Sequence, residues 1–178
     1  MYKRQDTEEA VNFLLSQPIL GVDTETRPSF SKGRGFQVSL LQVSTRDTCY
    51  LFRLHLTGIT PAIIRFLEDK TVPKVGLSWH DDLLQLHKRA EFKPGYFIEL
   101  QDEAKKFGLQ DMSLQKLYAN LFHQKISKAQ RLSNWEASEL KDSQMAYAAT
   151  DAWCCINLYE EPVSYTHLRA HETRHDLV

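Results

Sequence analysis

An apolar stretch at residues 19–22 leads directly into Asp23-Thr24-Glu25. Its composition predicts a buried β-strand that ends in carboxylates. Because side chains alternate between the two faces of a strand, Asp23 and Glu25 share one face and lie about 7 Å apart. Carboxylates at this spacing can converge on a hard divalent cation that prefers oxygen ligands. The simpler interpretation is a strand that becomes polar where it reaches the surface.

Composition limits the classes of protein to consider. The chain has 178 residues, 42% of them hydrophobic and 25% charged, which is typical of one globular domain. Its net charge of −1 gives no overall basic signal for nucleic acid, so a polyanion would have to be bound locally. The three cysteines form no disulfide framework, and we expect a reducing, cytoplasmic location. No signal peptide and no apolar run of membrane-spanning length is evident, so no membrane partner is expected.

The order of predicted elements indicates an α/β fold. The chain opens with a helix capped by Asp6 and closed by Pro18, followed by the strand that carries Asp23. After a polar loop at 27–36, strands at 38–43 and 49–52 make three consecutive, antiparallel strands. The following elements alternate: a helix opening at Thr60-Pro61, a strand at 74–78, a helix at 81–88, a strand at 96–100, short helices at 103–107 and 113–121, a loop at 125–135 and a long helix at 142–159. This order predicts a mixed sheet in an α/β layer fold.

Further polar residues occur where α/β proteins build sites. Asp82 lies at a strand–helix junction, although an acid there is often only a helix cap. Asp151 lies inside the long predicted helix, where aspartate is unfavourable and needs a partner. Tyr147 precedes Asp151 by four residues and so shares its helical face, although a core tyrosine would fit equally well.

Together these residues resemble the DEDD superfamily of 3′–5′ exonucleases, in its tyrosine-bearing, ribonuclease D-like subgroup. The resemblance covers roughly residues 11–159 and rests on motifs at 23–25, 74–83, 132–136 and 147–151. It implies a ribonuclease H-like fold, with a mixed central sheet flanked by helices. In the second motif the family places its acid directly before an apolar residue, and Leu83 fills that place. We therefore assign Asp82 to the site and Asp81 to capping or solvent.

The resemblance also implies an activity. The chain would hydrolyse phosphodiester bonds of single-stranded RNA or DNA from a free 3′ end and release nucleoside 5′-monophosphates. Asp23, Glu25 and Asp151 would hold one divalent cation, Asp23 would share a second, and Asp82 would hold the second mainly through water. Oxygen ligands favour Mg²⁺ or Mn²⁺, and Tyr147 would orient the attacking water. The alternative is a catalytically inactive nucleic-acid-binding module on the same fold.

Basic residues near the motifs are candidates for contacting the phosphate backbone. Arg27, Lys32 and Arg34 follow the first motif, and Lys125, Lys128 and Arg131 precede the last helix. Each is equally compatible with solvated loop charge. Trp79 and Phe30 could stack on bases or serve only in packing.

The end of the sequence departs from the pattern of the rest. Residues 162–178 have few apolar side chains and resemble translated adapter sequence, so we expect an exonuclease domain at 1–161 and a non-native tail after it. His167, His171 and His175 recur every four residues, which could also mimic a metal site on a helix. Ribonuclease D carries helical nucleic-acid-binding domains after its exonuclease domain. No such domain is evident in this sequence, so tRNA processing is not implied.

Overall fold

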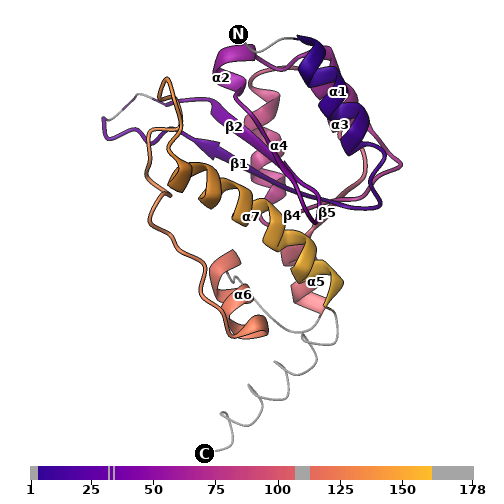
Figure 1. Cartoon of the computed structure of the whole chain (residues 1–178), viewed down its shortest axis with the longest axis vertical. Coiled ribbons are helices and arrows are strands. Elements are labelled where there is room, and N and C mark those ends of the chain that lie inside the picture. Colours follow the sequence, from indigo (N-terminus) through magenta and orange to yellow (C-terminus); the bar gives the residue numbers. More distant parts are fainter. Residues whose placement is uncertain (1–3, 32, 34, 107–112, 162–178) are drawn as a thin grey trace, which may run out of the picture.

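A single mixed sheet of five strands organises the computed structural model, which describes residues 4–31, 33, 35–106 and 113–161 (Figure 1). The strand order is β3-β2-β1-β4-β5. The central strand β1 (Leu20–Thr26) pairs antiparallel with β2 (Val38–Ser44) and parallel with β4 (Lys74–Gly76). Beyond them, β3 (Cys49–Phe52) pairs with β2 and β5 (Phe97–Glu99) with β4. The predicted mixed sheet, with three consecutive antiparallel strands, is confirmed.

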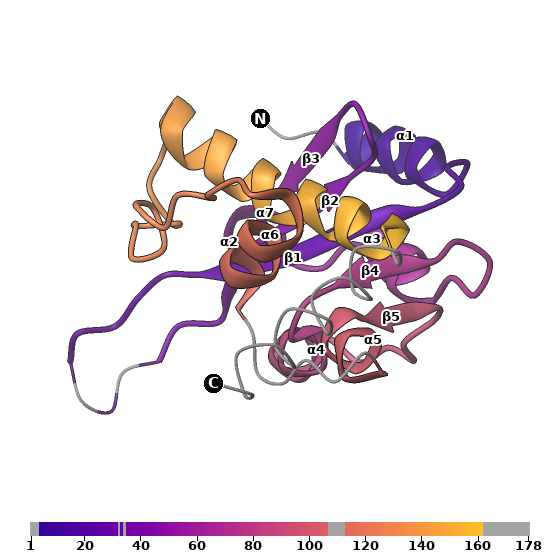
Figure 2. The ribbon, with the colours of Figure 1, turned by 90° about the horizontal axis from the view of Figure 1, so that it is seen from below.

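Helices cover both faces of the sheet. On one face lie α1 (Arg4–Leu14), α3 (Pro61–Glu68) and α4 (Trp79–His87), whose apolar side chains share a core with β1 and β2. On the other face α7 (Asp142–Glu160) crosses the sheet, with α5 (Leu100–Lys106) and α6 (Leu114–Phe122) beside it (Figures 1 and 2). The short α2 (Leu54–Thr57), which the sequence pattern did not predict, follows β3. Within the described residues, no helix combines the length and apolar character needed to cross a membrane.

Close packing of α7 on β1 depends on a glycine. A Cβ atom at Gly21 would overlap the backbone carbonyl of Ala152 and contact the side chain of Ile156. Because glycine has no side chain, the helix backbone can approach the strand directly at this point. The approach brings the middle of α7, which carries Asp151, against the strand that carries Asp23.

The starts of α1 and α5 differ from the sequence prediction. Helix α1 begins at Arg4, so Asp6 lies in its first turn and is not the N-cap. An acidic side chain in a first turn is favourable by its interaction with the helix dipole, so composition alone cannot separate these positions. Helix α5 begins at Leu100, three residues earlier than predicted. The predicted end of this helix, Phe107, lies outside the described residues.

Helix α4 begins at Trp79, two residues before the predicted start, because Ser78 adopts a left-handed conformation with φ 59°. Contacts from the next strand and helix hold this turn. The backbone N–H of Ser78 donates to Glu99 Oε1 at 2.8 Å, and Gln101 Nε2 donates to Ser78 Oγ at 3.0 Å. Strand β4 ends at Gly76, two residues earlier than predicted.

Candidate active site

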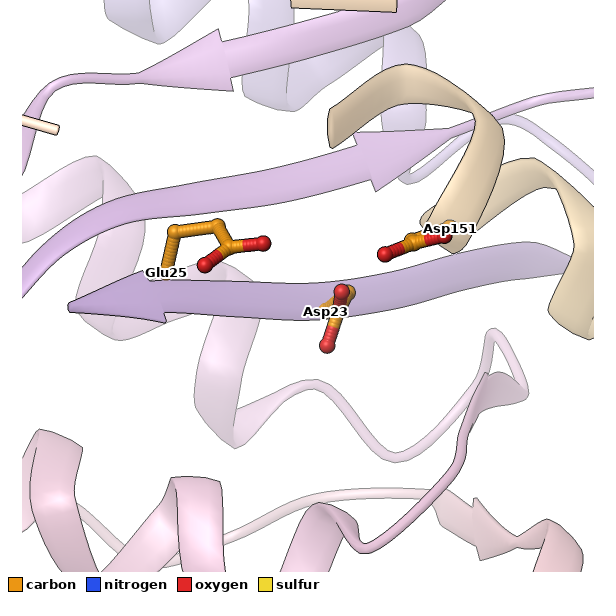
Figure 3. Close-up of side chains that lie close together, drawn as sticks. All are labelled: Asp23, Glu25 and Asp151. Atoms are coloured by element: carbon orange, nitrogen blue, oxygen red, sulfur yellow. The ribbon is translucent and has the colours of Figure 1, made fainter. Parts of the chain in front are cut away.

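Three carboxylates converge where α7 crosses the centre of the sheet (Figure 3). Asp23 and Glu25 project from the same face of β1, as their spacing predicts, and Asp151 comes down from α7. One carboxylate oxygen from each residue lies within 4.8 Å of the others. Asp23 and Glu25 are half-buried, and Asp151 is 4% exposed. The site therefore joins residues that are more than 120 positions apart in sequence.

Burial and mutual repulsion disfavour negative charge on these side chains. Burial and repulsion from Asp82 and Asp151 raise the pKa of Asp23 well above its ordinary value. Burial and repulsion from Asp151 and Asp82 raise the pKa of Glu25 to about 8. Burial raises the pKa of Asp151 to about 6. A bound cation would relieve both effects at once.

The donor set fits a hard divalent cation. All three residues offer carboxylate oxygens, which suit Mg²⁺ and Mn²⁺ better than softer metals. Asp151 Oδ1 is buried and has no hydrogen-bond partner among the described residues. A buried acceptor without a partner is unfavourable in a folded protein, and coordination of a cation would satisfy it.

Asp82 approaches β1 from the opposite face. Its Oδ1 accepts a hydrogen bond from Thr24 Oγ1, whose side chain points away from Asp23 and Glu25 by strand alternation. Burial raises the pKa of Asp82 to about 7. Asp82 lies close enough to Asp23 to raise the pKa of that carboxyl. The neighbouring Asp81 is exposed.

Tyr147 lies one turn before Asp151 on α7, as the spacing of the two residues predicts. It is 8% exposed and packs with Trp135, Leu40 and Ala148 in a small apolar cluster. The ring centroids of Tyr147 and Trp135 are 6.1 Å apart. Burial and the neighbouring carboxylates raise the pKa of the Tyr147 phenol well above its ordinary value. The hydroxyl is therefore protonated at neutral pH.

Two hollows lie along α7. A groove of about 460 Å³ runs between α6, the loop that follows it and α7, and is lined in part by Tyr118, Ile126, Tyr147 and Trp153. A second pocket of about 420 Å³ is lined in part by Asp23 and Asp151 and by the polar side chains of Ser78, Gln101, Ser113 and Gln115. Of these two hollows, the second reaches the carboxylates, and the first borders Tyr147.

The basic candidates differ in their surroundings. Arg27 is already engaged, with Nη1 at 3.4 Å from Glu136 Oε2 and its guanidinium 4.7 Å from the centroid of the Phe36 ring. Lys128 is exposed and lies near enough to Asp151 to lower the pKa of that carboxyl. Lys125 lines the groove, and Arg131 is exposed on the same loop. Lys32 and Arg34 lie outside the described residues, as do the tail at 162–178 and its three histidines.

The two aromatic candidates have opposite environments. Trp79 is 1% exposed and stacks on Phe97, with ring centroids 5.2 Å apart, so it belongs to the core and is not free to stack on a base. Phe30 is 84% exposed in the loop after β1.

Sequence reasoning did not identify two residues that border the site. Thr24 holds Asp82, and its position between the two acids of the first motif was the available signal. Gln42 is fully buried in β2 directly opposite Asp23. Its signal was a long amide side chain between the apolar residues Leu41 and Val43 of a predicted strand.

The sheet order and the helices on both faces define a ribonuclease H-like fold. The chain belongs to the 3′–5′ exonuclease family, whose sequence profile matches residues 1–161. The resemblance to ribonuclease D-like exonucleases stated from the motifs is thereby confirmed.

Individual relatives agree with this assignment. The chain is 29% identical over 149 residues to the mouse bifunctional 3′–5′ exonuclease/ATP-dependent helicase WRN, a match that covers 80% of this chain. It spans 11%, 27% and 51% of three curated relatives that it matches, so it corresponds to only part of each.

Two solved structures show the same fold. The Aedes aegypti Nibbler EXO domain superposes with a TM-score of 0.80 at 20% identity, covering 93% of this chain and 87% of that one. Trypanosoma brucei ribonuclease D, solved in complex with RNA U12, gives a TM-score of 0.75 at 18% identity, covering 99% of this chain and 69% of that one.

Proposed function

We propose that this chain is an active, metal-dependent exonuclease that removes nucleotides from the 3′ end of single-stranded RNA or DNA. The observation that carries the proposal is the convergence of Asp23, Glu25 and Asp151, with oxygens within 4.8 Å of one another and pKa values raised by burial and repulsion. The family assignment supports exonuclease chemistry, and the RNA complex of a structural neighbour supports a nucleic acid partner.

Each site residue has a role in this proposal. Asp23, Glu25 and Asp151 would hold divalent cations, Mg²⁺ or Mn²⁺, and Asp82 would assist from the other side of β1 through water. When bound, two such cations stabilise the charge that develops on the attacking and leaving oxygens. Tyr147, with its protonated hydroxyl, positions the attacking water by a hydrogen bond and does not act as the base.

The reaction is a hydrolysis at the last phosphodiester. The water oxygen forms a bond to phosphorus, and the bond between phosphorus and the 3′ oxygen of the preceding nucleotide breaks. The attacking water loses one proton, the departing 3′ oxygen takes one up, and a nucleoside 5′-monophosphate is released. Lys125 lines the groove beside Tyr147 and Lys128 lies near Asp151, and in this proposal both would bind the phosphates of the incoming strand.

The test uses 5′-labelled single-stranded RNA and DNA of the same sequence with Mg²⁺, Mn²⁺ or EDTA. We expect progressive shortening with either metal and none with EDTA, and the preferred sugar will identify the substrate class. Asp151→Asn should be inactive, whereas Asp142→Asn, an exposed acid on the same helix, should retain activity. Cleavage of a circular substrate would contradict an exonuclease, and binding without cleavage would favour the inactive binding module.

A further inference from the structure

Gln42 occupies the centre of the sheet next to the carboxylate cluster. It lies in β2, and its Cα pairs directly with that of Asp23 in the antiparallel ladder. Directly paired residues project from the same face of a sheet, with Cβ atoms about 4.5–5.5 Å apart. Gln42 therefore lies under α7 on the face that carries Asp23 and Glu25. It is 0% exposed.

The buried amide of Gln42 has no partner. Neither Nε2 nor Oε1 makes a hydrogen bond to any residue that the structure describes. On its other side the ladder pairs Gln42 with Leu51, which offers only an apolar side chain. Along β2 the next polar residue on this face, Ser44, donates its hydroxyl to the Thr45 carbonyl. The polar side chain directly opposite the amide is thus the carboxylate of Asp23.

An unsatisfied amide in a protein core needs an explanation. Buried polar groups are nearly always hydrogen-bonded, and leaving one unpaired destabilises the fold. Residues that orient metal ligands commonly do so by hydrogen bonds from outside the coordination sphere. Such a bond requires a donor opposite a ligand carboxylate, and Gln42 Nε2 is a donor in that position.

We propose that Gln42 is a positioning residue for the metal site, a role that rests on the proposed function. With a divalent cation bound, Gln42 Nε2 donates a hydrogen bond to one oxygen of Asp23 and leaves the other oxygen directed at the cation. The hydrogen bond fixes the orientation of the Asp23 carboxylate, so that its free oxygen can bind the same cation as Glu25 and Asp151. The buried amide thus destabilises the metal-free protein and orients Asp23 when the cation is bound.

This role predicts two opposite effects of one substitution. Gln42→Met keeps the length of the side chain and removes the amide. In EDTA the melting temperature should rise by about 2 °C or more, because a buried unsatisfied group is lost. The affinity for Mn²⁺, measured by titration calorimetry and by electron paramagnetic resonance of free Mn²⁺, should fall by about 10-fold or more. Gln42→Leu serves as a second variant if Gln42→Met does not fold.

The matched control is Leu41→Met, a fully buried neighbour on the same strand whose side chain occupies the other face. It should leave Mn²⁺ affinity unchanged. Unchanged Mn²⁺ affinity in a folded Gln42→Met protein would overturn the positioning role and leave the proposed function standing. Absence of Mn²⁺ binding by the wild type would overturn both, so the two failures are distinguishable.

Discussion

In the absence of divalent metal, the free energy of unfolding of this protein should decrease as pH rises from 5 to 8. The pKa of Glu25 is raised to about 8 and that of Asp151 to about 6 in the folded protein. Raised carboxyl pKa values mean that the folded state binds more protons than the unfolded state in this interval. The contribution of these groups to the free energy of unfolding is therefore complete below the ordinary carboxyl pKa and is lost as pH rises through the pKa values of the folded state.

The size of this decrease can be calculated from Asp151, because its side chain is almost fully buried. The rise of its pKa from 3.8 to about 6 corresponds to about 3 kcal/mol of unfolding free energy over the whole titration, of which about 1.4 kcal/mol is lost between pH 5 and pH 8. For a chain of this size, the loss between pH 5 and pH 8 lowers the melting temperature by about 3–6 °C. A bound cation compensates the negative charge, so saturating Mn²⁺ should remove most of the fall.

The assay is thermal unfolding followed by circular dichroism at pH 5, 6, 7 and 8, in EDTA or in Mn²⁺. Asp151→Asn removes one charge and its repulsion of Glu25, so in EDTA this variant should melt above the wild type at pH 8. Asp142→Asn, at an exposed position of the same helix, should follow the wild type. Parallel melting profiles for wild type and Asp151→Asn in EDTA would refute the reasoning.

Three further predictions concern the geometry of the site and its surroundings. Tyr147→Phe should slow turnover by about 10-fold or more while Mn²⁺ affinity stays near normal, since it removes a hydroxyl and no ligand; an unchanged rate would exclude the tyrosine from the mechanism. Asp82→Asn should lower the rate by about 100-fold or more, and Asp81→Asn should keep most activity; the reverse result would move the second motif by one residue. Gly21→Ala should lower the free energy of unfolding in urea by about 1–3 kcal/mol, because the added Cβ pushes α7 away from β1. Gly35→Ala is the control: its Cβ would meet nothing within 4 Å, so this variant should unfold at nearly the same urea concentration as the wild type.

Local patterns in the sequence determined much of the fold. The start of α3 followed from Thr60, whose side chain accepts a hydrogen bond from the Ile63 N–H, and from the proline after it. The shared face of Asp23 and Glu25 followed from the two-residue period of a strand. The shared face of Tyr147 and Asp151 followed from the helical repeat. These features depend on neighbours in sequence, so they can be read without the structure.

Tertiary contacts decided the remaining features. Helix α4 begins at Trp79 because Glu99 and Gln101, from the following strand and helix, hold Ser78 in a left-handed turn. The engagement of Arg27 with Glu136 joins residues more than 100 positions apart, and no local pattern encodes it. These contacts form only after the elements have packed.

The placement of the site also required the folded chain. Strand alternation puts Asp23 and Glu25 on one face but does not say what covers that face. The register of β2 against β1 brings Gln42 opposite Asp23, and the absence of a side chain at Gly21 lets α7 approach closely enough to add Asp151. Register and helix approach are set by long-range packing, and so only the tertiary structure reveals which side chains the carboxylates meet.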